Sequence, residues 1–189
     1  MDTSEFWTII EAARSAGGPD MPFAEALVDE LAVLTKDGVL SYQERFDEVR
    51  AAVYRWDVWA AAYLIGGGCS DDSFTDFRAG LIALGRHWYE KAAACPDSLA
   101  EHPAVIAAAT VHRDEALFYE EVNYAASEAF ARITGDGEDF YEAWDAYRTS
   151  RDSAERGSEG MGEDFDFDDP DEMRRRLPRL AALCLRDAP

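Results

Sequence analysis

The chain has 189 residues, with 39 acidic against 18 basic side chains and a formal net charge of −21. Its length suits one domain with its own core, and 48% hydrophobic residues is the composition of a globular rather than a disordered protein. So negative a surface repels nucleic acid and anionic membranes. Keeping the protein soluble is the favoured interpretation of the charge, and a basic protein or peptide partner is the alternative.

Apolar residues recur at helical spacing along most of the chain. The predicted helices cover residues 3–16, 23–35, 41–65, 73–94, 105–134, 138–152 and 170–185. The third segment is long for one helix, so we expect a break near residues 55–57. No segment alternates with period two as a strand would. The predicted fold class is therefore all-α, a single-domain multi-helix bundle.

The composition changes after the sixth predicted helix. SAERGSEGMGEDFDFDDP, residues 153–170, is rich in glycine, serine and acids, as exposed or flexible linkers are. We expect a helical domain over residues 1–150, an acidic linker over 151–169, and a C-terminal helix over 170–189. The apolar face of that last helix predicts that it docks on the domain.

Cysteine usage and the apolar runs indicate the compartment. Cys69, Cys95 and Cys184 are widely spaced and form no Cys-x-x-Cys pair, which argues against a disulfide framework or a structural zinc. No apolar run approaches the roughly 20 residues of a membrane helix. The acidic start, MDTSEFWTII, lacks the basic region of a signal peptide. We expect a cytoplasmic protein without a cofactor.

The segment GGGCSDDSFTDFR, residues 66–78, concentrates special residues and has several interpretations. A phosphate loop is disfavoured, because neither GxGxxG nor GxxxxGK[ST] is present and two aspartates would repel the phosphate. A nucleophilic Cys69 would gain from the following helix N-terminus, but Asp71 and Asp72 oppose its ionisation. Asp71, Asp72 and Asp76 offer oxygen ligands for Mg²⁺ or Ca²⁺ without the EF-hand spacing, so we assign no metal.

A helix cap accounts for most of the same segment. Ser73, with an acid three residues later, resembles a capping box and predicts that the helix starts there. Asp72 would then lie just outside the helix and accept from its N–H groups. We expect Arg78 to pair with Asp57 on the preceding helix, which leaves Asp71 free for a ligand.

The run WDVWAAAYLIGGGCSDDSFTDFRAGLIALGR, followed by PDSLAEHP, resembles the core motif of the bacterial domain-of-unknown-function family 4240. FWTIIEAAR and EALFYEEVNYAASEAFARITG are also similar to that family, so the resemblance covers roughly residues 1–135. The chain departs from the family pattern at Ala79-Gly80, where tryptophan is commoner, and at Gly66, where asparagine is common. The resemblance implies a domain and no activity.

Two functions of different classes fit these features. The first is a binding or regulatory domain for a peptide or protein partner, supported by the net charge and by an acidic tail in which Phe165 and Phe167 alternate with acids. The alternative is a small enzyme or small-molecule-binding protein with a pocket around GGGCSDD. For either, the expected ligand-binding residues are Trp56, Trp59, Tyr63, Asp71, Asp72, Arg78 and Arg86. The catalytic candidates are Asp71, Asp57 and Cys69.

A second polar group lies in the predicted helix over residues 105–134. His112 and Glu115 form a His-x-x-Glu pair, the spacing found in di-metal carboxylate bundles. Such a centre needs a second copy of the pair and two more inward glutamates, which the sequence does not offer. A solvated helix face is the favoured interpretation.

Overall fold

The computed structural model describes residues 1–111, 116–151 and 160–185. Within these ranges all regular secondary structure is helical, apart from one isolated antiparallel bridge between Gly18 and Met21. The all-α prediction is therefore confirmed. The chain forms two compact units, Met1–Ala51 with Glu121–Ser158, and Ala52–Glu120 with Glu159–Pro189. The predicted boundaries of domain, linker and C-terminal helix stay a prediction.

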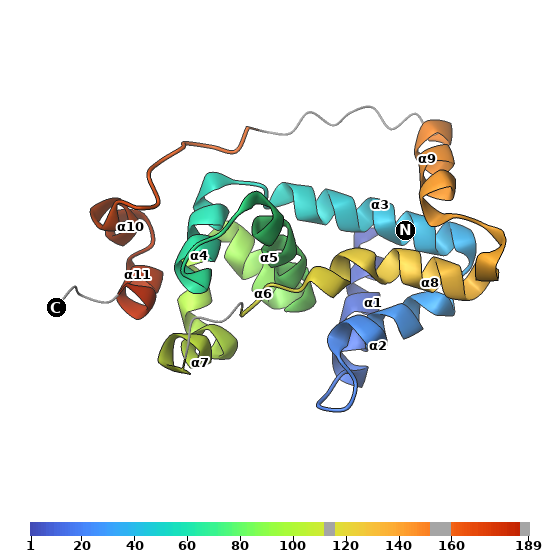
Figure 1. Cartoon of the computed structure of the whole chain (residues 1–189), viewed down its shortest axis with the longest axis horizontal. Coiled ribbons are helices and arrows are strands. Elements are labelled where there is room, and N and C mark those ends of the chain that lie inside the picture. Colours follow the sequence, from blue (N-terminus) through green and yellow to red (C-terminus); the bar gives the residue numbers. More distant parts are fainter. Residues whose placement is uncertain (112–115, 152–159, 186–189) are drawn as a thin grey trace. The chain divides into compact units, whose positions relative to one another are not determined.

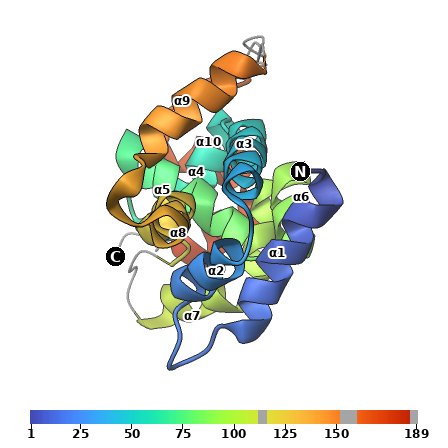
Figure 2. The same cartoon turned by 90° about the vertical axis from the view of Figure 1, so that its right-hand side faces the viewer.

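The first unit packs three N-terminal helices with two later ones (Figure 2). Its helices are α1 (Thr3–Ala16), α2 (Phe23–Ala32), α3 (Lys36–Ala52), α8 (Ala125–Thr134) and α9 (Phe140–Ser150), with short 3-10 turns at Glu120–Tyr124 and Gly135–Gly137. α2 lies against both α1 and α8. In its core the Tyr42 ring stacks between Phe6 and Phe46, at centroid distances of 5.3 and 6.1 Å. Burial raises the pKa of Tyr42.

The second unit holds the middle and the end of the chain (Figure 1). Its elements are α4 (Trp56–Gly66), α5 (Asp71–Ala83), α6 (Arg86–Ala94), the 3-10 helix η1 (Pro96–Glu101), α7 (Pro103–Val111), α10 (Pro170–Arg176) and α11 (Pro178–Cys184). The predicted break near residues 55–57 is confirmed, because α3 ends at Ala52 and α4 begins at Trp56. The predicted C-terminal helix is two short helices, since Pro178 starts a new one.

One long helix over residues 105–134 is a wrong prediction. α7 ends at Val111, and residues 116–119 are not helical. Leu117 has φ of 76°, a conformation that non-glycine residues rarely adopt. A Cβ on Gly80 would lie only 1.7 Å from the Leu117 carbonyl oxygen, so glycine is needed where the chain crosses α5. This tertiary contact overrides the helical periodicity of the sequence.

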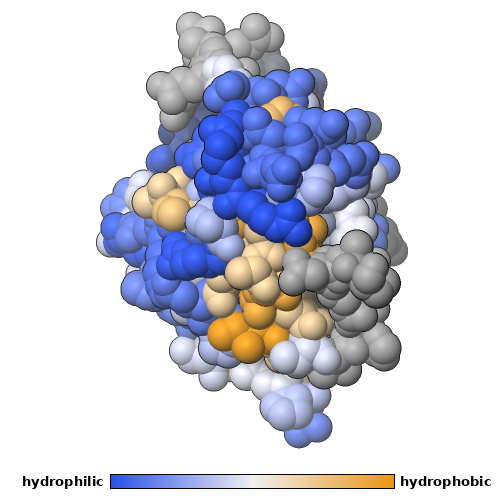
Figure 3. Space-filling model, turned by 90° about the vertical axis from the view of Figure 1, so that its left-hand side faces the viewer, coloured by the Kyte–Doolittle hydropathy of each residue, from blue (hydrophilic) through white to orange (hydrophobic). Residues whose placement is uncertain are grey.

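α7 adds an uncharged surface to the second unit. Its sequence, PAVIAAATV, has no charged residue. Val105 is buried, whereas Ile106 is 43% exposed. Helix α7 contacts η1, α4 and α11. Figure 3 draws the face of the molecule that lies on the left in Figure 1, and it shows apolar residues gathered in one area among mainly hydrophilic ones.

Candidate functional site

Four rings of the second unit stack in a row that we call the aromatic ladder: Tyr54, Phe74, Trp59 and Trp56. The Tyr54 and Phe74 centroids are 5.9 Å apart with planes at 28°. Phe74 and Trp59 are 4.7 Å apart at 11°. Trp59 and Trp56 follow at 5.4 Å and 8°. Nearly parallel rings at these distances make one continuous π surface, in which Phe74 is buried, Trp56 and Trp59 are half-buried and Tyr54 is exposed.

Helical spacing explains how α4 presents its part of this surface. Trp56 and Trp59 are three residues apart and Tyr63 is four further on, so all three follow one side of the helix. α4 ends at Gly66 and is capped by Gly67, whose φ of 68° suits glycine, and the chain turns there towards α5. That turn lets Phe74 of α5 enter the ladder beside Trp59.

Arg78 of α5 lies at one end of the ladder. Its guanidinium carbon is 4.8 Å from the Tyr54 ring centroid and 5.0 Å from that of Phe74, which is cation–π geometry. Arg78 also donates to the Thr75 hydroxyl at 3.2 Å. This end of the ladder therefore binds a guanidinium group.

The predicted pairing of Arg78 with Asp57 is wrong. Asp57 instead accepts two hydrogen bonds from Arg55, at 2.9 and 2.8 Å. Arg55 precedes α4, and it also donates to the Ala93 carbonyl at 2.9 Å. A partner two residues away reaches Asp57 without any rearrangement, whereas Arg78 is drawn to the ring faces.

Residues 160–168, which we call the cover segment, lie on the other end of the ladder. The Phe167 ring centroid is 6.0 Å from Trp56, 6.4 Å from Trp59 and 5.5 Å from Tyr63, with all three pairs steeply inclined. Tyr63 donates its hydroxyl to Asp168, and this hydrogen bond raises the pKa of Tyr63. The Trp56 amide donates to the Met161 carbonyl at 2.9 Å.

The glycine-rich turn is a helix cap, but not the predicted one. Ser70 is the N-cap residue, and its hydroxyl accepts from the Ser73 amide at 3.2 Å. The N-cap therefore lies three residues before the predicted Ser73 cap, and α5 begins at Asp71. Asp71 and Asp72 lie inside the first turn, where their charges favour the helix dipole. Both are exposed, and among the described residues neither carboxylate has a hydrogen-bond or ion-pair partner.

Cys69 lies beside the ladder as a protonated thiol. Its carbonyl accepts from the Trp59 indole N–H at 3.1 Å. Burial raises the pKa of Cys69 to about 12, and the charges of Asp76 and Asp71 add to the shift. A thiol in this state is a weak nucleophile at neutral pH. Cys69 is therefore the least suited of the three catalytic candidates.

The remaining predicted site residues lie apart from the ladder. Arg86 opens α6, is exposed and forms an ion pair with Glu90 at 2.7 Å. Among the described contacts none joins Arg86 to the ladder. His112 and Glu115 lie outside the described residues. In the ranges the structure covers, no three histidine, cysteine or carboxylate side chains converge as a metal site would require.

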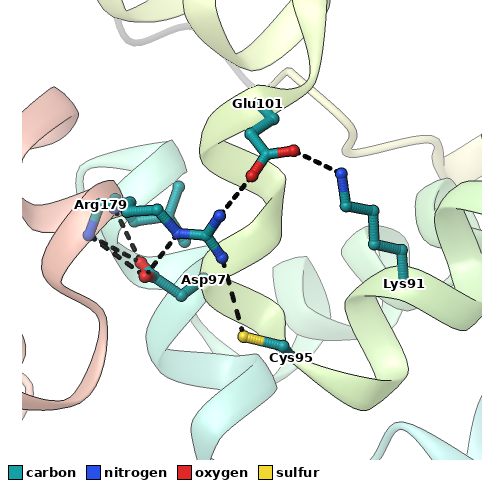
Figure 4. A network of polar contacts seen from close by, with 6 residues as sticks. Lys91, Cys95, Asp97, Glu101 and Arg179 are labelled. Atoms are coloured by element: carbon teal, nitrogen blue, oxygen red, sulfur yellow. Dashed lines mark hydrogen bonds and ion pairs between the residues drawn. The ribbon is translucent and has the colours of Figure 1, made fainter.

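A polar cluster that we call the clamp attaches the C-terminal helices (Figure 4). The buried carboxylate of Asp97 accepts from the Arg179 and Leu180 amides at 3.0 and 2.9 Å, so it caps α11 from outside. It also pairs with the Arg179 side chain at 3.0 Å. Glu101 joins Arg179 to Lys91 and completes the clamp.

Sequence reasoning identified only part of these arrangements. The spacing on α4 predicts Trp56, Trp59 and the neighbouring Tyr63 as site residues, but it does not indicate that Phe74 and Tyr54 join the ladder. The alternation of phenylalanine and acids near Phe167 is visible in the sequence, but its contact with α4 is not. The clamp was missed, because no local pattern links Asp97 to Arg179, which lie far apart in the sequence.

A family model described as a protein of unknown function, DUF4240, matches residues 1–132. The chain therefore belongs to this family, which confirms the resemblance seen in its motifs. No curated protein and no solved structure matches the chain. The whole ladder lies within the matched residues, whereas the cover segment, α10 and α11 lie beyond them. None of the described helices is long and apolar enough to cross a membrane.

Proposed function

We propose that the protein is a cytoplasmic binding or regulatory domain that recognises a basic segment of a peptide or protein partner. The recognition surface consists of Trp56 and Trp59, which form the α4 end of the aromatic ladder, together with the neighbouring Tyr63. One observation carries the proposal: this end holds a side chain of an irregular peptide segment, Phe167 of the chain itself. A surface that accepts one ring from such a segment suits an anchor side chain of a partner peptide.

The ladder itself supports a cationic anchor. The faces of aromatic rings carry negative potential and attract guanidinium and ammonium groups. Arg78 already uses this attraction on Tyr54 and Phe74, at 4.8 and 5.0 Å. The rings of Trp56 and Trp59 continue the same stack, so a partner arginine would meet the same chemistry there.

The charge of the chain favours the same class of partner. A net charge of −21 attracts basic segments over a distance of about a Debye length, roughly 8 Å at physiological salt. Near α4, Asp71 and Asp72 at the start of α5 supply exposed carboxylates. Long-range attraction would bring the partner near, and the ring faces would select where it binds.

A labelled peptide of alternating arginine and glycine tests the proposal by fluorescence polarisation at physiological ionic strength. We expect Trp56→Ala to weaken binding about fivefold, since a cation–π contact contributes on the order of 1 kcal/mol. Trp144→Ala is the matched control, because Trp144 stacks on Tyr147 in the other compact unit. Neither substitution changes the charge of the protein.

The control variant should bind within about twofold of the wild type. Equal affinity of both variants and the wild type would mean that only the overall charge attracts the peptide, and the proposed site would then be wrong. A glutamate–glycine peptide should not bind to any of the three proteins, because its charge has the same sign as theirs.

A further inference from the structure

We infer that the cover segment is an internal competitor that occupies the recognition surface until a partner displaces Phe167. This inference rests on the proposed function, because it assigns a regulatory role at the same site. Phe167 contacts the three side chains that the partner would need, Trp56, Trp59 and Tyr63. A partner side chain and Phe167 cannot both lie on these rings.

The contacts of the cover segment suit reversible attachment. It has no regular secondary structure, and Gly160 and Gly162 lie at its start. Its described attachments to α4 are the Phe167 ring, one hydrogen bond from Tyr63 and one from the Trp56 amide. Its contacts with Arg176, an ion pair from Glu163 at 3.1 Å and the Phe165 ring at 4.2 Å, join it to α10 and not to α4. A segment held to α4 by so few contacts opens there at a lower free energy than the core around it.

The clamp keeps the cover segment close to its site when it opens. α10 and α11 follow the segment directly, and the buried Asp97 holds the start of α11. A tethered segment acts as if present at millimolar concentration, so even weak contacts compete with a partner. The apparent affinity for the partner is therefore the intrinsic affinity multiplied by the fraction of time that the cover segment leaves the site free.

Competition with the partner and a purely structural role of Phe167 predict different effects of removing this side chain. If Phe167 only completed the packing of α4, its removal would disorder the ladder and weaken partner binding. If it competes, its removal frees the site and strengthens binding. The two roles predict affinity changes of opposite sign.

The experiment measures binding of the arginine–glycine peptide to the full chain and to Phe167→Ala. We expect Phe167→Ala to bind about tenfold more tightly, because about 1.4 kcal/mol of competing contact is lost. Phe165→Ala is the matched control. Phe165 lies in the same segment and under the Arg176 guanidinium at 4.2 Å, and its described ring contact is with Phe167 rather than α4. It should change the affinity by no more than about threefold.

A second measurement protects the test against a variant that is poorly folded. A synthetic peptide with residues 160–170 should displace the arginine–glycine peptide from the Phe167→Ala protein, and the same peptide with Phe167→Ala should not. Unchanged or weaker binding by Phe167→Ala, or no displacement, overturns the inference. If Trp56→Ala still weakens binding in that case, the proposed function survives. If no variant binds the arginine–glycine peptide, the proposed function fails as well.

Discussion

The C-terminal part of the chain is attached to the second unit in two different ways. At the clamp, the buried carboxylate of Asp97 accepts hydrogen bonds from two backbone amides and one side-chain N–H at the start of α11. At the cover, Phe167 lies at an angle on half-buried rings of α4, assisted by a hydrogen bond between Tyr63 and Asp168 on the surface. One attachment is polar, buried and directional, whereas the other is aromatic and partly solvated.

This difference indicates which attachment is permanent. Moving α11 away from Asp97 would leave a buried charge and two helix N–H groups without partners, which costs a large free energy. Lifting Phe167 exposes part of one ring to water and leaves no buried charge behind. The clamp is thus expected to anchor the C-terminal helices while the cover opens and closes.

The largest expected effect is at the clamp. Asp97→Ala should lower the free energy of unfolding by about 3 kcal/mol, because it removes the cap of α11 and the buried partner of Arg179. Urea denaturation followed by circular dichroism measures the change. The matched control is Asp72→Ala, an exposed aspartate, which should stay within about 0.5 kcal/mol of the wild type. A loss at Asp97 no larger than at Asp72 would contradict the anchoring role.

A smaller effect is expected at the cover. Phe167→Ala should lower the free energy of unfolding by about 1 kcal/mol in the same assay, since the half-buried ring loses aromatic contacts but no charge pair. A loss equal to that of Asp97→Ala would show that the cover is as firmly held as the clamp. The contrast between the two attachments would then be wrong.

The two attachments should respond to pH in opposite directions. At the clamp, Lys91 and then Arg179 hold the pKa of Glu101 below its ordinary value. Because the pKa of Glu101 is lower in the folded state, its ionised carboxylate stabilises the fold at pH values above its ordinary pKa of about 4.5. This contribution is lost as the pH falls. At the cover, the pKa of Tyr63 is raised, so its contribution is present below about pH 10 and is lost as the pH rises.

Amide exchange of the two regions checks these signs. Acid should lower the protection of the Arg179 and Leu180 amides first. Alkali should lower the protection of the Trp56 amide, which donates to the cover segment. Exchange must be compared with that of a core helix such as α1, because intrinsic rates also change with pH. Equal relative protection at all pH values would rule out both electrostatic contributions.

The smallest expected effect is that of Tyr63→Phe. The substitution removes the hydroxyl that donates to Asp168 and keeps the ring that contacts Phe167. A hydrogen bond at the surface contributes about 0.5 kcal/mol, so the arginine–glycine peptide should bind about twofold more tightly. Weaker binding by this variant would mean that the hydroxyl serves the partner rather than the cover.

The sequence predicted the helices where local signals agree with the tertiary structure. The spacing of Trp56, Trp59 and Tyr63 placed all three on one side of α4, and the glycines after them marked the turn into α5. The cap was assigned to Ser73 because an acid, Asp76, follows it three residues later, whereas Ser73 occupies that position after Ser70. The capping-box pattern therefore favours the wrong one of two nearby serines.

The errors and omissions come from contacts between distant segments. Residues 105–134 have helical periodicity, yet α7 ends at Val111 and residues 116–119, where Leu117 passes over Gly80, are not helical. Likewise, nothing near Asp97 indicates that its partner is Arg179, and nothing near Phe167 indicates α4. Such contacts depend on how the helices pack, which periodicity does not specify.

The most direct test of the central claim is an NMR titration of the full chain with the arginine–glycine peptide. The chain has five tryptophans, and their indole N–H signals serve as reporters: Trp7, Trp56, Trp59, Trp88 and Trp144. Trp56 and Trp59 lie at the proposed site, and single Trp→Phe variants assign their signals. The account predicts that these two signals shift with saturation while the other three stay in place. Equal shifts of all five signals, or none at Trp56 and Trp59, would contradict it.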